Sequence, residues 1–177
     1  MAEIQLKRDF ILFINPFGGQ GRAMEIWKSV ESIFSIKLYY LLIESSDINV
    51  FVFQTQKVKH AYEELLTMDP NKYCGILTCS GDGIIHEVIN GLLHRKDSLD
   101  IPIGVIPGGS ANGLAKTICH QSEEDCDKYI ASFIICKGHT KMMDVMEIEL
   151  LSSKEYVYSF LGIAWGNIAD IDLDSEV

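Results

Sequence analysis

Short runs of apolar residues alternate with amphipathic stretches along most of the chain. Four short runs are expected to be strands: 10–14, 38–43, 73–79 and 101–106. The first is apolar on both faces, which is typical of a buried parallel strand. Between and after these runs, apolar residues recur every three or four positions, which predicts helices over 24–34, 50–68, 84–93, 114–118 and 129–134. Ser122-Glu123-Glu124-Asp125 has the spacing of a capping box and is expected to begin the last helix. The sequence therefore predicts an α/β fold, a mostly parallel sheet with helices on both faces.

The pattern changes after Lys137. Residues 144–150 alternate between polar and apolar positions, Ser152-Ser153-Lys154-Glu155 has the composition of a turn, and 156–161 is a second β run. This arrangement is typical of an antiparallel hairpin. We therefore expect one domain over 1–138, and over 139–177 the beginning of an antiparallel β domain that the chain does not complete.

The composition restricts the partners and the compartment. The 177 residues carry a formal net charge of −10, which argues against nucleic acid as a partner because phosphate backbones select surfaces rich in Lys and Arg. The five cysteines are odd in number and form no C-x-x-C pair, so we expect free thiols in a reducing compartment. The early apolar run, 10–14, is too short for a signal peptide or a membrane span. These features predict a soluble cytoplasmic protein, and transient peripheral contact with membranes stays open.

A glycine-rich loop follows three of the predicted strands: 15–21, 80–83 and 107–113. Because parallel strands end at the same edge of a sheet, we expect these loops to meet at one site. Glycine lets backbone N–H groups reach an anion, and the helix that begins after each loop favours negative charge. One such loop alone is more often a tight turn, but three together predict a cradle for a polyphosphate.

Asp82 lies between two glycines in the second loop. Its structural interpretation is an N-cap for the helix over 84–93. Its functional interpretation is a carboxylate beside a phosphate, where it accepts the proton of an attacking hydroxyl or holds Mg²⁺. Glu87, one helical turn beyond Gly83, is either a solvated residue or a partner that orients the loop.

Four segments carry a resemblance to a known family. Residues 15–19, 80–92 and 107–115 resemble the diacylglycerol kinase catalytic-domain superfamily, which includes diacylglycerol, ceramide and sphingosine kinases. Residues 164–176 are similar to the corresponding segment of sphingosine kinases. The resemblance implies a Rossmann-like nucleotide-binding catalytic domain, then a β-sandwich that binds lipid, with the active site in the cleft between them. It also implies Mg²⁺-ATP as phosphoryl donor and the primary hydroxyl of a sphingoid base as acceptor, so that sphingosine becomes sphingosine 1-phosphate.

The resemblance assigns roles residue by residue. Asp82 matches the catalytic base, and Asp172 matches the carboxylate that recognises the amino and hydroxyl head group of the lipid. The residues assigned to the nucleotide are Asn15, Pro16, Phe17, Gly18, Gly19, Glu44, Ser80, Gly81, Gly83, Glu87, Gly109, Ser110 and Ala111. The lipid head is assigned to Ser80, Gly81, Asp82 and Gly83 together with Asp172, and no side chain is assigned to the metal.

One motif of the family is poorly kept in this sequence. The family carries Thr-Glu-x-x-Asn-His-Ala after its second strand, where it contacts adenosine. Here the motif is expected at 43–49, and Glu44 is the residue that matches.

Other functions stay open at this point. One alternative is a truncated, non-catalytic nucleotide-binding fragment, and another is a lipid kinase of the ceramide or diacylglycerol type. A kinase for a soluble substrate, such as the NAD kinase type, shares the Gly-Asp-Gly turn. The last alternative is a βαβ domain without a ligand.

Overall fold

The computed structural model describes residues 8–18, 21–35, 48–69, 71–97 and 100–163. The chain divides into two compact units, one over Met1–Lys141 and the other over Met142–Val177. The two units are described separately below.

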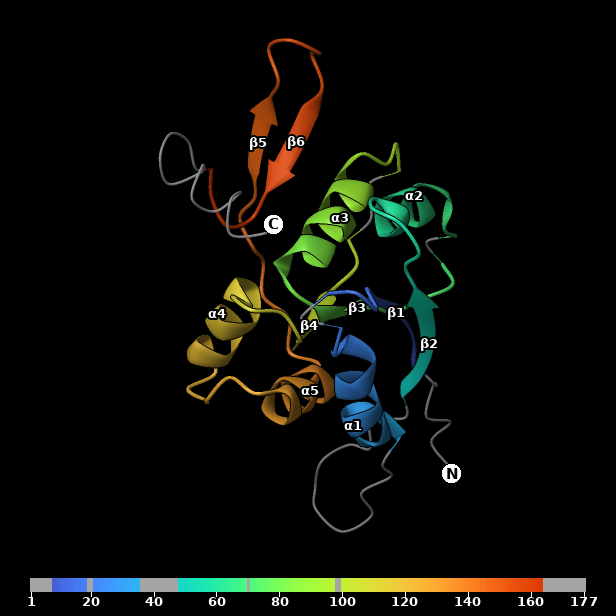
Figure 1. The fold of residues 1–177 in the computed structure, drawn as a ribbon, viewed down its shortest axis with the longest axis vertical. Helices are drawn as coiled ribbons and strands as arrows, with labels where there is room; N and C mark the ends of the chain where they lie inside the picture. The colour runs from blue at the N-terminus through green and yellow to red at the C-terminus, as the bar shows by residue number, and fades with distance from the viewer. Residues whose placement is uncertain (1–7, 19–20, 36–47, 70, 98–99, 164–177) are drawn as a thin grey trace, which may run out of the picture. The chain divides into compact units, whose positions relative to one another are not determined.

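The first unit contains, within the described residues, a parallel sheet of four strands in the order β2-β1-β3-β4 (Figure 1). The strands are β1 Arg8–Ile14, β2 Ile48–Gln54, β3 Gly75–Ser80 and β4 Ile103–Pro107. In the register, Ile14 pairs with both Gln54 and Cys79, and Ser80 pairs with Pro107. The strands therefore end at one edge of the sheet, which is where the loops begin. The predicted parallel α/β sheet is confirmed.

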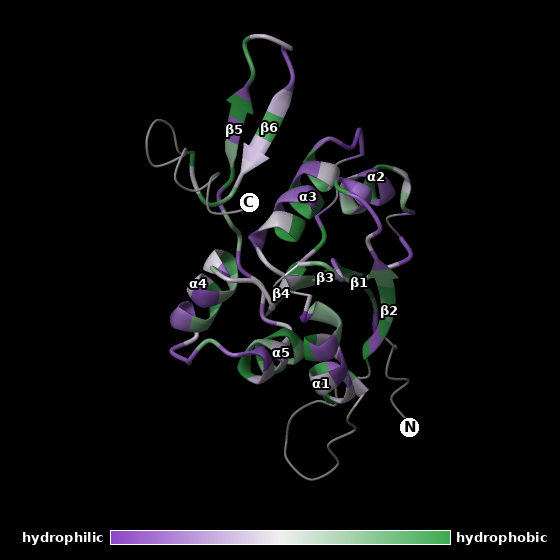
Figure 2. Cartoon of the chain, in the orientation of Figure 1, coloured by the Kyte–Doolittle hydropathy of each residue, from purple (hydrophilic) through white to green (hydrophobic). Residues whose placement is uncertain are grey.

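Helices cover both faces of this sheet. They are α1 Ala23–Ser35, α2 His60–Thr67, α3 Asp82–Leu93, α4 Gly113–Gln121 and α5 Lys128–Lys137. Figure 1 shows α1 and α5 on one face, and α2 and α3 on the other. Figure 2 shows hydrophobic and hydrophilic residues alternating along these helices, as expected for amphipathic helices packed on a sheet.

The core on the α1 face is formed by α1 and the two inner strands. Trp27, Val30 and Phe34 of α1 are buried in a cluster with Leu12 of β1 and Leu77 of β3. Burying a side chain of this size contributes about 1.5–3 kcal/mol, so this packing is a main source of stability for the sheet edge that carries the loops.

Two predicted boundaries are wrong. The stretch 50–68 was expected to be one helix, but β2 occupies Ile48–Gln54 and α2 begins only at His60. The β-branched and aromatic residues of 50–53 favour a strand over a helix. The capping box at 122–125 is also wrong, because Asp127 caps α5 and its carboxylate accepts hydrogen bonds from the N–H groups of Tyr129 and Ile130 at 2.6 and 2.8 Å. The predicted strand at 38–43 lies outside the described residues.

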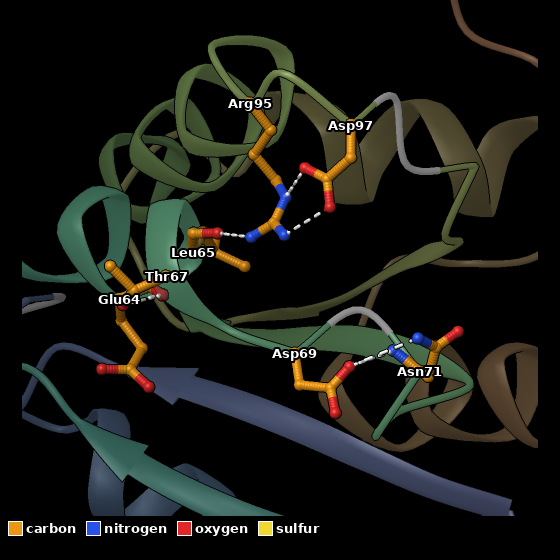
Figure 3. Close-up of polar contacts among 7 residues, drawn as sticks. All are labelled: Glu64, Leu65, Thr67, Asp69, Asn71, Arg95 and Asp97. Carbon is orange, nitrogen blue, oxygen red and sulfur yellow. Dashed lines mark hydrogen bonds and ion pairs between the residues drawn. The ribbon is translucent and has the colours of Figure 1, made fainter.

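A buried arginine joins the ends of α2 and α3 (Figure 3). The side chain of Arg95 is 5% exposed, and it donates two hydrogen bonds of 2.9 Å to the carboxylate of Asp97 and another to the carbonyl of Leu65. The hydrogen bond from Arg95 lowers the pKa of Asp97. Gly91 lets the helices approach closely, since a Cβ there would lie 2.9 Å from Cβ of Leu65. These contacts fix α3, whose first residue is Asp82.

Cys74, Cys79, Cys119 and Cys126 are free thiols. Cys79 and Cys119 are buried, and burial raises the pKa of each thiol to about 12, so both are unreactive. Cys74 is exposed at the start of β3, and Cys126 is half-buried before α5.

The second unit contains the antiparallel hairpin that the sequence predicts. Its strands, β5 Met146–Glu149 and β6 Tyr156–Ser159, pair with Met146 opposite Ser159. The hydroxyl of Tyr158 donates to the carboxylate of Glu147 at 3.0 Å, and this bond raises the pKa of Tyr158. Across both units, none of the helices that the structure describes is long and apolar enough to cross a membrane.

Candidate active site

The three glycine loops meet at the carboxyl edge of the sheet, as predicted. A Cβ added to Gly18 in the first loop would collide with the hydroxyl of Ser80 in the second. A Cβ on Gly109 in the third loop would lie 2.9 Å from the nitrogen of Gly81 and closer still to its Cα. The N–H of Gly108 also donates to the carbonyl of Ser80 at 2.9 Å. Glycine is therefore required here because the loops touch each other through their backbones.

The first loop folds back on itself directly after β1. The side-chain oxygen of Asn15 accepts a hydrogen bond from the N–H of Phe17 at 3.0 Å, and its carbonyl accepts from Gly18 at 3.1 Å. Phe17 lies at the tip and is 81% exposed. Gly21 has a positive φ of 76°, which only glycine adopts readily. The loop thus presents Phe17 to solvent beside the second loop.

Asp82 connects the second loop to the third. It is the first residue of α3, and its side chain does not cap that helix, whose N-cap is Gly81. Instead, its carboxylate accepts hydrogen bonds from the N–H groups of Gly113 at 2.8 Å and Leu114 at 3.3 Å, at the start of α4. The carboxylate therefore lies at the N-termini of two helices, where negative charge is favoured. The N-cap interpretation had the right kind of contact but the wrong helix.

A residue that the sequence analysis did not single out holds the third loop closed. Asn112 accepts a hydrogen bond from the N–H of Gly109 at 2.7 Å and donates one to its carbonyl at 2.6 Å. Its φ is 52°, in the left-handed region where Asn is the most tolerated residue after glycine. This bracket leaves Ser110 and Ala111 exposed at the tip of the loop. The sequence signal for this role is an Asn two residues before the predicted helix over 114–118, which is a position where Asn often caps a helix.

A fourth loop, after β2, was also missed. Thr55 is buried, and its N–H and hydroxyl both donate to the carbonyl of Ile14, at 2.9 and 3.3 Å. The N–H of Gln56 donates to Nδ1 of His60 at 3.1 Å. Thr55, His60 and Ala61 have the spacing of the family motif Thr-Glu-x-x-Asn-His-Ala. Because β2 occupies Ile48–Gln54, this spacing predicts the motif after β2, with Gln56 at the position of its Glu, in place of the expected position at 43–49.

Glu87 supports this fourth loop from α3. Its two carboxylate oxygens accept hydrogen bonds from the N–H groups of Lys59 at 2.9 Å and Ala61 at 3.1 Å. Lys59 is the N-cap of α2 and has a positive φ of 62°. Of the two interpretations of Glu87, the partner that orients a loop fits these contacts, although the loop is the one before α2.

Not every assigned residue falls within the described ranges. Gly19, Glu44 and Asp172 lie outside them, as does the segment 164–176. Glu44 also precedes β2 in the chain, so it does not belong to the loop after that strand.

The arrangement suits the phosphates of a nucleotide. Backbone glycines meet at the N-termini of α3 and α4, which is the usual geometry for binding phosphate. Within the described ranges, no group of three or more His, Cys, Asp or Glu side chains is placed to hold a metal ion.

A parallel α/β sheet with glycine loops at its carboxyl edge defines a nucleotide-binding type of fold. Residues 9–148 match the family described as "Diacylglycerol kinase catalytic domain", and the chain belongs to this family.

The chain is similar to several curated proteins. It is 39% identical over 170 residues to sphingosine kinase 2 of Arabidopsis thaliana, covering 94% of this chain and 33% of that protein. It is 37% identical over 177 residues to sphingoid long chain base kinase 4 of Schizosaccharomyces pombe, covering 98% of this chain and 35% of that protein. The chain thus spans about a third of the length of these relatives.

A solved structure shares the fold. A putative diacylglycerol kinase from Bacillus anthracis str. Sterne superposes with a TM-score of 0.59 at 22% sequence identity, covering 79% of this chain and 45% of that one.

Proposed function

We propose that this chain is the nucleotide-binding part of an ATP-dependent lipid kinase that phosphorylates the primary hydroxyl of a sphingoid base. The family match and the relatives named sphingosine kinase support the class of reaction. The observation that carries the proposal is the position of Asp82, between two glycine loops and hydrogen-bonded to the start of α4.

In the proposed reaction, the loops bind the phosphates of ATP, and Mg²⁺ supplies neutralisation of charge on the transferred group. Asp82 accepts the proton of the lipid hydroxyl. Its Oδ2 is held at 2.8 Å by Gly113, while Oδ1 is only weakly engaged at 3.3 Å by Leu114. A carboxylate has about four acceptor sites, so Oδ1 keeps the capacity to take the proton. Asp172 pairs with the amine of the lipid, and Thr55 and Gln56 face the adenosine.

The anchoring of Asp82 has a chemical purpose in this scheme. Phosphoryl transfer relies mainly on positioning and on stabilisation of charge, so a fixed acceptor is more useful than a mobile one. A sphingoid base resides in membranes, so the proposal also requires transient peripheral contact between the protein and a membrane surface.

The test combines binding and transfer on the same preparation of the chain. Calorimetry measures the binding of Mg-ATP, and radiolabelled ATP is offered with sphingosine, ceramide, diacylglycerol or NAD. Transfer to sphingosine that is lost in Asp82→Asn supports the proposal. Binding without transfer to any acceptor favours the non-catalytic fragment, and transfer to another acceptor assigns the chain to that alternative. Absence of nucleotide binding contradicts the proposal.

A further inference from the structure

An open pocket of about 440 Å³ adjoins the third glycine loop on the side where α1 and α5 begin. It is lined by the loop residues Pro107, Gly108, Gly109, Ser110 and Asn112, by Arg22 and Ile26, and by Cys126, Asp127 and Lys128. Ser110 and Gly109 also belong to the nucleotide loop, and Asn112 holds that loop closed. The pocket is therefore continuous with the candidate active site.

Two cations line this pocket, Arg22 directly before α1 and Lys128 at the start of α5. The chain as a whole carries a net charge of −10, so Arg22 and Lys128 form a local concentration of positive charge on an acidic protein. The one carboxylate in the lining, Asp127, is already engaged as the N-cap of α5 and accepts two hydrogen bonds there. The lining thus carries two cations and one carboxylate, an excess of one positive charge.

Lys128 has no acidic partner among the described side chains. No ion pair within 4.0 Å involves it in the ranges that the structure covers, whereas Arg22 shares an exposed pair with Glu25 at 3.7 Å. Burial raises the pKa of Cys79 at the end of β3, and the positive charge of Lys128 partly opposes this effect. Its ammonium group also lies 5.1 Å from the ring centre of Tyr129, a cation–π distance.

We propose that Lys128, together with Arg22, binds the terminal phosphates of the nucleotide in this pocket. The proposal rests on the proposed function, and it adds a phosphate-binding residue from α5 that no glycine motif includes. A lysine is a compact point charge with three donors, well suited to phosphate oxygens. The hydroxyl of Ser110 also lines the pocket and supplies a further donor.

The experiment compares two variants that change the net charge equally. Lys128→Gln removes the cation in the pocket, while Lys137→Gln removes a cation from the other end of the same helix. Gln and Lys have similar helix propensities, so both variants are expected to fold, and thermal melting checks this. Calorimetry then measures the affinity of the unaltered chain and of each variant for Mg-ATP, Mg-AMP and inorganic tripolyphosphate.

We expect Lys128→Gln to lower the affinity for Mg-ATP and for tripolyphosphate about tenfold, which is the effect of losing one charge-assisted hydrogen bond. The affinity for AMP, which lacks terminal phosphates, should change less than about twofold, as should every affinity of Lys137→Gln. If Mg-ATP binds the unaltered chain and Lys128→Gln equally well, the inference is wrong and the proposed function stands. If Lys128→Gln lowers the affinity for Mg-AMP as much as that for Mg-ATP, the inference is also wrong. If the unaltered chain binds neither ATP nor tripolyphosphate, both are wrong.

A lipid head group offers the same phosphate chemistry, and one arm of the experiment separates the two sources. Vesicles that contain phosphatidylserine are sedimented with each variant. Vesicle binding that depends on Lys128, without an effect of Lys128→Gln on ATP, would assign the pocket to a lipid and overturn the nucleotide assignment.

A second measurement needs no variant. Cys126 lines the pocket, whereas Cys74 is exposed and directly precedes β3, at the end of that strand away from the glycine loops. Iodoacetamide labelling of the folded chain, followed by mass spectrometry, compares the two thiols with and without Mg-ATP. Protection of Cys126 but not of Cys74 supports the inference. Equal labelling rates at Cys126 with and without saturating Mg-ATP would overturn it.

Discussion

Replacing Asp82 by Asn should destabilise the fold as well as impair transfer, because the carboxylate caps α4. The N–H groups of Gly113 and Leu114 lie 2.8 and 3.3 Å from its two oxygens. Hydrogen bonds to a charged acceptor contribute about 1.5–3 kcal/mol, and the favourable interaction with a helix N-terminus adds about 0.3–1 kcal/mol. Asn keeps one acceptor oxygen but brings an NH₂ donor toward the second N–H. We therefore expect a loss of about 2 kcal/mol in the free energy of unfolding, which corresponds to about 4–8 °C in melting temperature for a chain of this size.

The assay is thermal and urea unfolding of the chain, followed by circular dichroism. The matched control is Asp125→Asn, the same chemical change at an exposed position of the loop between α4 and α5. Its effect should stay within about 0.5 kcal/mol, as for most surface substitutions. Equal melting temperatures for Asp82→Asn and Asp125→Asn would refute the capping role. Loss of transfer would then reflect chemistry alone, without any contribution from a displaced third loop.

Three further predictions concern the support of the loops. Gly109→Ala should lower the free energy of unfolding by about 1–3 kcal/mol, because the added methyl group overpacks against the second loop. Gly83→Ala is the control and should not destabilise the fold, since a Cβ there meets nothing within 4 Å. Equal melting temperatures for the two variants would contradict the close approach of the loops. Glu87→Gln should lower the free energy of unfolding by about 1 kcal/mol and speed amide hydrogen exchange at the start of α2. Unchanged exchange at the start of α2 would contradict this supporting role of Glu87. Arg95 lowers the pKa of Asp97 from its usual 3.8, so the contribution of Asp97 is present above that value and is lost as the pH falls through the folded pKa. The difference in urea midpoint between the chain and Asp97→Asn should therefore shrink on acidification below about pH 4, and a difference independent of pH would disprove the linkage.

The parallel sheet was predictable because its inner strands are buried on both faces. All six residues of β3 are buried, and so are the last four of β1, so both strands have apolar residues on both of their faces. The edge strand β2 lacks this signal. Its Phe51 and Val52 are each more than 40% exposed, and its residues run directly into the loop before α2. Edge position is a property of the sheet and not of the local sequence, so the strand was merged with the helix that follows.

The candidate site was predictable as a place but not as a set of contacts. Glycine spacing after each strand was sufficient to expect that the loops meet, because strands in a parallel sheet end at one edge. Local sequence favours contacts within a few residues, and so it suggested that Asp82 caps its own helix. The observed partners are 31 and 32 positions away in the chain, at Gly113 and Leu114. Glu87 follows the same rule, since it caps a helix 26 and 28 positions before it, at Ala61 and Lys59.

These long-range caps share a physical logic that bears on the proposed reaction. Helix N-termini that face an anion must be satisfied when the ligand is absent and yet remain in place when it binds. Asp82 and Glu87 satisfy the first amides of α4 and α2, which fixes those helices before any nucleotide arrives. The glycine loops between them are left to bind phosphate through their backbones. A site organised in advance loses less free energy to ordering when the ligand binds. We therefore expect nucleotide binding to change amide exchange in the three glycine loops far more than in α2 or α4, and comparable changes in the helices would contradict this division of roles.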